Sequence, residues 1–182
     1  AADDHGVQPL EEHKAECLFE WGHLRALEKI GEGAMGVAVN RPNSGFSLVE
    51  ILKGAGMPIP ERPLPPVHVG GPVELESAFI LYLSDYQTEH KLDISETVSL
   101  TRETRVLEDI ANGRGPEHYL FILGYTGWGP GQLENELLDN GWLMLPANDN
   151  IIFHMKDELK WKAAAMEYGI DIAAFEDVIG YA

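Results

Sequence analysis

An apolar run at residues 119–124 constrains the fold of this chain more than any other feature. It reads Tyr-Leu-Phe-Ile-Leu-Gly and contains no charged residue. Short apolar runs of this kind, bounded by turn residues, are typical of strands that are buried in a sheet. The glycine-rich segment 125–131 follows, and after it Leu133, Leu137 and Leu138 recur at helical spacing. The sequence therefore predicts a buried strand, a glycine-rich loop and a helix, in this order.

The remaining pattern mixes strands and helices without a strict strand–helix repeat. Such a mixture favours an α+β or irregular α/β fold, in which a mixed sheet is flanked by several helices in a single compact domain. Ser47 and Thr101 are expected to cap two helices, because a side-chain oxygen can accept a hydrogen bond from the first N–H groups of a helix. Strands are expected at residues 35–40, 67–69, 78–83, 142–145 and 150–153, and further helices at residues 48–55, 102–111, 157–168 and from Asp171 onward.

The first thirty residues carry a different pattern. Apolar residues recur at helical spacing over residues 10–30, and the charged residues fall largely between them. This pattern predicts one amphipathic helix that ends at residues 31–33, because glycine tolerates the left-handed turn that closes many helices. The chain is therefore expected to consist of an N-terminal helical segment at residues 1–30 and a compact domain at residues 31–182.

The charge of the chain excludes one class of function. It has 13 Lys and Arg residues against 30 Asp and Glu residues, which gives a formal net charge of −17. A protein that grips nucleic acid needs a basic surface, because contacts to phosphates supply most of the non-specific affinity. Direct binding of DNA or RNA is therefore not expected.

Cysteine content and the lengths of the apolar runs bear on the compartment. The single cysteine, Cys17, cannot form an internal disulfide, and residues 1–5 lack the charged and then apolar build of a secretory signal. The apolar runs are also far shorter than the roughly 20 residues that span a bilayer. We expect a cytoplasmic protein that does not enter the membrane.

The familiar motifs of catalysis and cofactor binding are missing from the sequence. No Lys-Ser or Lys-Thr follows the glycines at residues 127–131, as a phosphate-binding P-loop requires, and no Gly-x-Ser-x-Gly nucleophile motif occurs. The seven histidines do not match the spacing of a zinc site. We therefore predict no catalytic residue, no metal and no cofactor.

Polar and glycine residues at the ends of the expected strands remain as candidates for ligand binding. Residues at strand ends and in glycine loops commonly line clefts. Each candidate also has a structural interpretation: the arginine can pair with a carboxylate, the asparagine can hold a turn, and the tryptophan can cap the core. The candidates are Asn40, Arg41, Gly70, Gly71, Gly127, Trp128 and Gln132.

Three motifs in the same region resemble those of one known family. They are Glu-Gly-Ala-Met-Gly-Val-Ala-Val-Asn-Arg-Pro at residues 32–42, Val-Gly-Gly-Pro-Val at residues 69–73, and Leu-Gly-Tyr-Thr-Gly-Trp-Gly-Pro-Gly-Gln-Leu-Glu at residues 123–134. Together, and in this order, they resemble the AlgH/YqgE family. The resemblance implies a small bacterial cytosolic protein with a compact α/β fold and with no established cofactor or catalytic residue. Members of this family are often labelled as transcriptional regulators.

The N-terminal segment departs from the pattern of that family. Members usually begin with a Leu-rich strand and a second strand ahead of the Glu-Gly-Ala-Met-Gly motif, whereas residues 10–30 here carry a helical pattern. Without those two strands, the strand at residues 35–40 would have an unpaired edge that invites pairing with another chain. This reasoning leads to the hypothesis that the N-terminal helix covers the edge or is exchanged in a homodimer.

These observations lead to three functional expectations. The first is a non-enzymatic binding or regulatory protein whose partner is an unidentified protein or small molecule, so that any effect on transcription is indirect. The second is an enzyme or binding protein for a small anionic metabolite, with Arg41 and the loop of residues 127–131 as the anion site. Direct regulation on DNA comes last, because the chain is strongly acidic.

Overall fold

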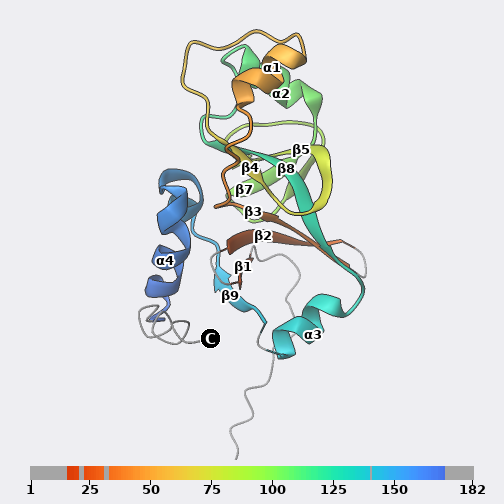
Figure 1. Cartoon of the computed structure of the whole chain (residues 1–182), viewed down its shortest axis with the longest axis vertical. Coiled ribbons are helices and arrows are strands. Elements are labelled where there is room, and N and C mark those ends of the chain that lie inside the picture. Colours follow the sequence, from red (N-terminus) through yellow and green to blue (C-terminus); the bar gives the residue numbers. More distant parts are fainter. Residues whose placement is uncertain (1–15, 21–22, 31–32, 140, 171–182) are drawn as a thin grey trace, which may run out of the picture.

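The computed structural model describes residues 16–20, 23–30, 33–139 and 141–170, and within them a curled sheet runs through the molecule (Figure 1). The strands follow the order β6-β7-β5-β8-β3-β2-β1-β9, and β4 pairs with β8 in addition. The pairing of β4 with β8 is parallel, and the other paired strands are antiparallel. The strands are β1 (Glu16–Glu20), β2 (His23–Ile30), β3 (Gly33–Ala38), β4 (Val67–Val69), β5 (Val73–Leu83), β6 (Lys91–Asp93), β7 (Val98–Thr101), β8 (Tyr119–Trp128) and β9 (Leu143–Pro146).

Helices cover the sheet on both faces. One apolar cluster joins β5 and β8 to the first two helices, and a second cluster joins the opposite face of the sheet to the last helix and to a π-helical turn. A third, smaller cluster holds the third helix against the far end of β8. The fold is therefore a mixed α/β domain with a sheet flanked by helices, which confirms the fold class predicted from the sequence. The helical elements are α1 (Leu48–Gly54), α2 (Thr104–Ala111), α3 (Gln132–Leu138), the π-helical turn η1 (Asn150–His154) and α4 (Asp157–Glu167).

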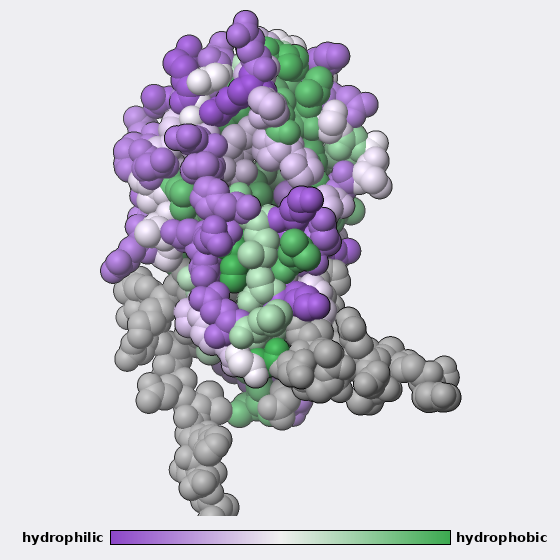
Figure 2. Space-filling model, turned by 90° about the vertical axis from the view of Figure 1, so that its left-hand side faces the viewer, coloured by the Kyte–Doolittle hydropathy of each residue, from purple (hydrophilic) through white to green (hydrophobic). Residues whose placement is uncertain are grey.

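The outer side of α4 is partly apolar. Leu159 and Met166 of this helix are exposed to solvent. Figure 2, which looks onto the left-hand side of Figure 1, shows an apolar strip between polar residues on this face. The helix thus buries one side against the sheet and leaves apolar atoms on the other.

Local sequence signals set several element boundaries. The Ser47 side chain accepts a hydrogen bond from the N–H of Glu50, which confirms the cap predicted at Ser47, and the Glu50 carboxylate accepts one from the N–H of Ser47, which completes a capping box. Asn112 ends α2 as expected. The prediction for the start of α2 was wrong, because Thr101 is the last residue of β7 and Glu103 is the N-cap.

The predicted N-terminal helix is wrong for the residues that the structure describes. Within residues 10–30, Glu16–Glu20 and His23–Ile30 are strands, and residues 10–15 and 21–22 lie outside the described part. β2 pairs with β3, and β1 pairs with both β2 and β9. Strand pairing across the sheet outweighs the helical spacing, since local propensity is weak against tertiary context. β3 accordingly has a neighbour on each side, β2 and β8, and the unpaired edge that motivated the homodimer hypothesis is absent there.

Two other expectations were also wrong. Residues 150–153, which were expected to be a strand, belong to the π-helical turn η1, whose Ile151 and Ile152 point into the core. Residues 125–128, which were expected to be a loop, continue β8, because Met35 and Gly36 of β3 pair with Gly127 and Thr126. The helix that was expected to begin at Asp171 lies outside the described residues.

The backbone after β4 approaches β8 so closely that only glycine fits. The N–H of Gly70 donates to the carbonyl of Leu123 at 2.8 Å. A Cβ atom at Gly70 would overlap the carbonyl of Gly124, and one at Gly71 would overlap the carbonyl of Tyr125. Gly70 and Gly71 therefore hold β4 against the middle of β8.

A buried polar cluster fixes α4 to the sheet. Lys160 Nζ donates to the carbonyl of Val39 at 2.7 Å and to Asp157 Oδ1 at 2.8 Å. His68 Nε2 donates to the same carboxylate at 3.0 Å, since a carboxylate can only accept. The side chains of His68 and Lys160 are 1% and 2% exposed. Burial alone would raise the pKa of Asp157, but the hydrogen bonds from His68 and Lys160 outweigh it and lower the pKa below its ordinary value of 3.8.

We expect Gly71→Ala to destabilise the protein by about 1–3 kcal/mol, because the added methyl group forces β4 away from β8. Gly54→Ala is the matched control: nothing lies within 4 Å of a Cβ at this position, and a Gly-to-Ala change without strain stabilises by about 0.4–1 kcal/mol. Urea denaturation of both variants measures the difference. Equal stability of the two variants would contradict the close approach.

We also expect Asp157 to make the stability depend on pH in acid. The native carboxyl binds its proton at lower pH than the unfolded one, so the unfolded state binds more protons as the pH falls below 3.8. The free energy of unfolding must therefore decrease in this range. The free energy of unfolding of Asp157→Asn should be about 1.5–3 kcal/mol lower than that of the wild type at neutral pH. In acid, it should change less with pH than that of the wild type.

Urea denaturation across this acid range measures the effect. Asp85→Asn, at an exposed aspartate outside the cluster, is the control and should keep the wild-type dependence. A wild-type slope in Asp157→Asn would show that other carboxylates carry the effect.

Candidate functional site

The candidate residues that follow β3 and β4 lie side by side. The Ala38 N–H donates to the carbonyl of Gly70 at 2.8 Å, and the Val69 N–H donates to the carbonyl of Arg41 at 2.9 Å. The structure therefore brings the strand end with Asn40 and Arg41 to the turn with Gly70 and Gly71. These contacts are made by the backbone, and the two glycines are required by the packing against β8 described above.

The candidates of the second group lie at the opposite end of β3. Trp128 pairs with Ala34, and Gly127 pairs with Met35. β3 continues from Ala34 to Ala38, which corresponds to about 13 Å of strand, and Asn40 and Arg41 follow its end. The structure therefore does not bring Arg41 and Trp128 into one cleft. A role of Arg41 in ligand binding stays a prediction.

Trp128 and Gln132 are held by a single carboxylate. The indole N–H groups of Trp128 and Trp142 donate to Glu136 Oε2 at 2.9 and 2.7 Å, and the two rings meet edge to face with centroids 5.6 Å apart. Gln132 donates to Glu136 Oε1 at 2.9 Å and accepts from the N–H of Gly129 at 3.1 Å. Trp128 is only 6% exposed. These contacts fix α3 to the end of β8.

A pocket opens on the sheet beside Trp128. Its volume is about 350 Å³, near the lower end of the range for small-molecule sites. β3, β5 and β8 form its floor and walls, and the segment between β7 and α2 supplies its charged residue. The lining residues are Gly33, Ala34, Met35, Phe79, Arg102, Tyr125 and Trp128.

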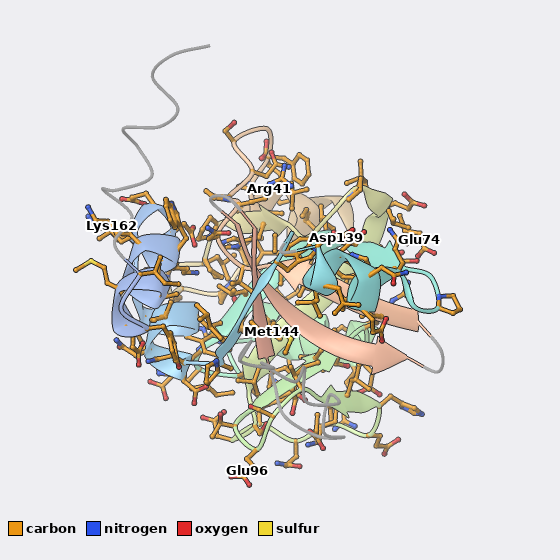
Figure 3. All side chains as sticks on the ribbon, turned by 90° about the horizontal axis from the view of Figure 1, so that it is seen from below. Arg41, Glu74, Glu96, Asp139, Met144 and Lys162 are labelled. Carbon is orange, nitrogen blue, oxygen red and sulfur yellow. The ribbon has the colours of Figure 1, made fainter. Side chains whose placement is uncertain are left out.

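Arg102 places a positive charge at this pocket. Its guanidinium carbon lies 5.0 Å from the centroid of the Phe79 ring, within the range of a cation–π contact. Its Nη2 donates to Ser77 Oγ at 3.0 Å and lies 3.7 Å from Glu74 Oε2. The side chain is 59% exposed. Figure 3, seen from below, shows Glu74 and Arg41 at separate places on the molecule, so the charged site at Arg102 is distinct from Arg41.

The pocket exists because the alternation of side chains along β8 shifts by one residue. Leu120 and Ile122 pack into the cluster beneath α4, and Tyr125 joins the same cluster. The shift occurs at Gly124, which has a φ of +71°. Gly127 then faces the same side as Tyr125, and its missing side chain leaves space opposite Met35.

Tyr125 and Phe79 form an aromatic wall of this pocket. Their ring centroids are 5.9 Å apart, with an interplanar angle of 71°. Edge-to-face contacts of this kind hold both rings in place. The wall is therefore formed before any ligand arrives.

Sequence reasoning identified Gly127 and Trp128 but missed Arg102, Phe79 and Tyr125. Phe79 was assigned to a buried strand, and Arg102 was not considered. The available signal was weak: an arginine immediately after the short strand Val98–Thr101, whose residues alternate between apolar and hydroxyl side chains, and glycines at strand positions 33 and 127. Nothing in the sequence shows that β3, β5 and β8 bring these positions together.

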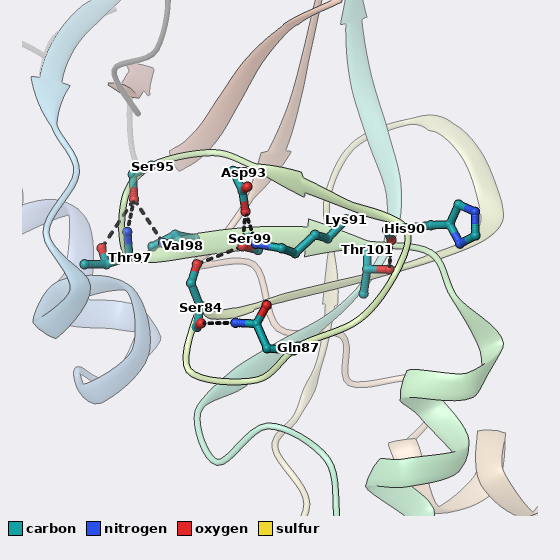
Figure 4. Close-up of polar contacts among 10 residues, drawn as sticks. All are labelled: Ser84, Gln87, His90, Lys91, Asp93, Ser95, Thr97, Val98, Ser99 and Thr101. Carbon is teal, nitrogen blue, oxygen red and sulfur yellow. Dashed lines mark hydrogen bonds and ion pairs between the residues drawn. The ribbon is translucent and has the colours of Figure 1, made fainter.

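A second polar network lies on the β6–β7 hairpin (Figure 4). Ser99 donates to Asp93 Oδ1 at 2.7 Å and is 2.8 Å from the hydroxyl of Ser84, and Lys91 also binds Asp93. The hydrogen bonds from Lys91 and Ser99 lower the pKa of Asp93. This network satisfies the buried Ser99 hydroxyl at the edge of the sheet. It stabilises the hairpin.

The described residues contain neither a metal-binding cluster nor a membrane-spanning helix. No group of three histidine, cysteine, aspartate or glutamate side chains is arranged to hold a metal ion in this part of the chain. None of the helices described here has both the length and the apolar composition needed to cross a bilayer.

Comparison with known proteins places the chain in a family. The AlgH-like family model (DUF179) matches residues 26–173. A UPF0301 protein of Desulfotalea psychrophila is 44% identical over 150 residues, which are 82% of this chain and 79% of that protein. A UPF0301 protein of Rickettsia africae is 41% identical over 165 residues, which are 91% of this chain and 87% of that protein.

Solved structures agree with this assignment. The solution structure of AlgH from Pseudomonas aeruginosa is similar with a TM-score of 0.72 and 32% identity, over 97% of this chain and 100% of that chain. A crystal structure of a protein from Corynebacterium diphtheriae has a TM-score of 0.59 at 13% identity, over 77% of this chain and 78% of that chain, and shows a likeness of fold alone. The three motifs, the family match over residues 26–173 and these likenesses lead to one conclusion: the chain belongs to the AlgH-like family.

Proposed function

We propose that this chain is a non-enzymatic binding protein that holds a small anionic molecule in the pocket beside Arg102 and acts as a regulator through a protein partner. The observation that carries the proposal is the composition of the pocket. Aromatic and apolar walls surround one guanidinium group, and none of the seven lining residues is a carboxylate, a histidine, a serine or a cysteine. Such a lining favours binding over acid–base or nucleophilic chemistry.

The position of the charge supports the anionic character of the ligand. Arg102 is the only charged residue among the lining residues, and its Nε and Nη1 donate no hydrogen bond to any described residue. Charge-assisted hydrogen bonds to a guanidinium are among the stronger polar contacts. In this proposal Arg102, and not Arg41, is the anchor for the anion. The net charge of −17 speaks against a direct contact with DNA, so an effect on transcription would pass through the partner.

We expect a thermal-shift screen of small anionic compounds at millimolar concentration to find ligands that stabilise the protein. A ligand at 100 times its dissociation constant adds about 2.7 kcal/mol. Arg102→Gln should weaken binding of such ligands about 10- to 100-fold, because a hydrogen bond to a charged group contributes about 1.5–3 kcal/mol. Gly127→Val should weaken ligand binding as well, because the valine side chain would lie beside Tyr125 and take up space in the pocket.

Arg41→Gln is the matched control, because it removes the same charge at the other end of β3. It should leave the affinity unchanged. A screen without any stabilising compound would contradict the proposal. Ligands whose affinity falls in Arg41→Gln and not in Arg102→Gln would instead place the anion site at the end of β3.

A further inference from the structure

One glutamate next to the pocket has an unusual backbone conformation. Within the described residues, Glu74 is the only residue other than glycine with a positive φ, which is 46°. Residues with a Cβ rarely adopt this conformation, and it persists only where the surroundings enforce it. Such strain is often found at ligand-binding sites.

Glu74 begins an irregular segment of β5. β5 pairs with β8 at Val73 opposite Tyr125 and again at Ala78 opposite Leu123, so that the four residues 74–77 face Gly124 alone. We call residues 74–77 the β5 arch. Glu74, Leu75 and Glu76 of the arch are exposed. The arch is therefore a bulge in β5, close in sequence to Phe79 of the pocket wall.

The arch directs the Glu74 carboxylate at Arg102. Ser77 Oγ donates to Glu74 Oε2 at 2.8 Å, and Arg102 Nη2 donates to Ser77 Oγ at 3.0 Å. Arg102 Nη2 and Glu74 Oε2 are 3.7 Å apart, which is an ion pair of moderate length. The Glu74 side chain is 47% exposed, so water competes with this contact. The Glu74 carboxylate thus pairs with Arg102, the one cation that lines the pocket, and this weak ion pair can be replaced by another carboxylate.

We propose that the ligand of this pocket is a planar ring that carries one carboxylate, and that Glu74 is an internal competitor which this carboxylate displaces from Arg102. The inference rests on the proposed function, since it names the ligand class for the same pocket. The ligand carboxylate carries the same single negative charge as the Glu74 carboxylate that it displaces, so the number of negative charges in contact with Arg102 stays the same. A phosphate with two charges would add negative charge beside Glu74 and to a chain that already carries −17.

The aromatic wall defines the rest of the ligand. The rings of Tyr125 and Phe79 stand at 71° to each other, and Met35 of β3 also lines the pocket. Aromatic edges and the polarizable sulfur of methionine make favourable contacts with a flat ring. The guanidinium over Phe79 then lies at the rim, where a carboxylate on the ring can accept two N–H groups.

The test uses the full chain and three probes: benzoate, benzamide and phenyl phosphate. Their affinities are measured by NMR titration of the wild type, Glu74→Gln and Glu76→Gln. Glu76→Gln is the matched control, because Glu76 lies on the same arch and loses the same charge. We expect Glu74→Gln to bind benzoate about two- to fivefold more tightly than the wild type, which corresponds to the loss of one solvent-exposed competing ion pair. Glu76→Gln should bind it like the wild type, and benzamide should bind all three proteins alike.

A second variant, Glu74→Gly, shows whether a change in affinity comes from loss of the carboxylate or from misfolding of Glu74→Gln. Glu74→Gly removes the same carboxylate and accepts a φ of 46° without strain. It should gain affinity for benzoate as Glu74→Gln does. If both variants bind benzoate like the wild type, Glu74 is not a competitor and the inference is overturned. If phenyl phosphate binds more tightly than benzoate, the carboxylate class is overturned.

The outcome is distinguishable from failure of the proposed function. Binding of anions that depends on Arg102 but not on Glu74 would overturn this inference alone. Absence of binding by any of the three probes to the wild type and to both Glu74 variants would also overturn it, while the broader screen with Arg102→Gln and Arg41→Gln decides the proposed function separately.

Discussion

The close approach of the chain after β4 to the middle of β8 is the constraint on which the rest of the structure depends. β8 pairs with β3, β4 and β5, so any displacement of this strand would disturb three neighbours. Gly70 and Gly71 allow the approach, and Gly124 takes a positive φ at the same level of β8. The shift at Gly124 moves Tyr125 to the face that carries Phe79. One backbone contact therefore determines both the packing of β4 and the position of the pocket.

Much of the fold could be predicted because the signals were local. The apolar run of β8, the cap at Ser47, and the end of α2 at Asn112 each depend on a few neighbouring residues. The errors arose where distant pairing decides. Residues 16–20 and 23–30 carry a helical pattern but pair within the sheet, and the glycines after Tyr125 extend β8 because β3 pairs with them.

The candidate site was predictable only in part, for the same reason. The glycines and Trp128 stand out as residue types, and Trp128 does line the pocket, while Gly127 lies next to Tyr125 of its wall. Arg102 has no distinguishing neighbours in the sequence, and it meets Phe79 only because β7 lies next to β5. No local sequence motif contains all of these residues, since Glu74 and Phe79 come from β5, Tyr125 from β8 and Arg102 from the segment between β7 and α2. Their meeting is a property of the strand order.

The strong negative charge of the chain and a pocket for an anion are compatible because they act over different distances. At physiological ionic strength the Debye length is about 8 Å, so exposed carboxylates farther away contribute little to the potential inside the pocket. Arg102 acts at contact distance, with its guanidinium over the Phe79 ring, so its attraction for an anion in the pocket exceeds the repulsion from those more distant carboxylates. Local geometry, and not the total charge, therefore decides which anion the pocket accepts. The carboxylate of Glu74 is part of that geometry, because it sets the charge that any incoming anion has to replace.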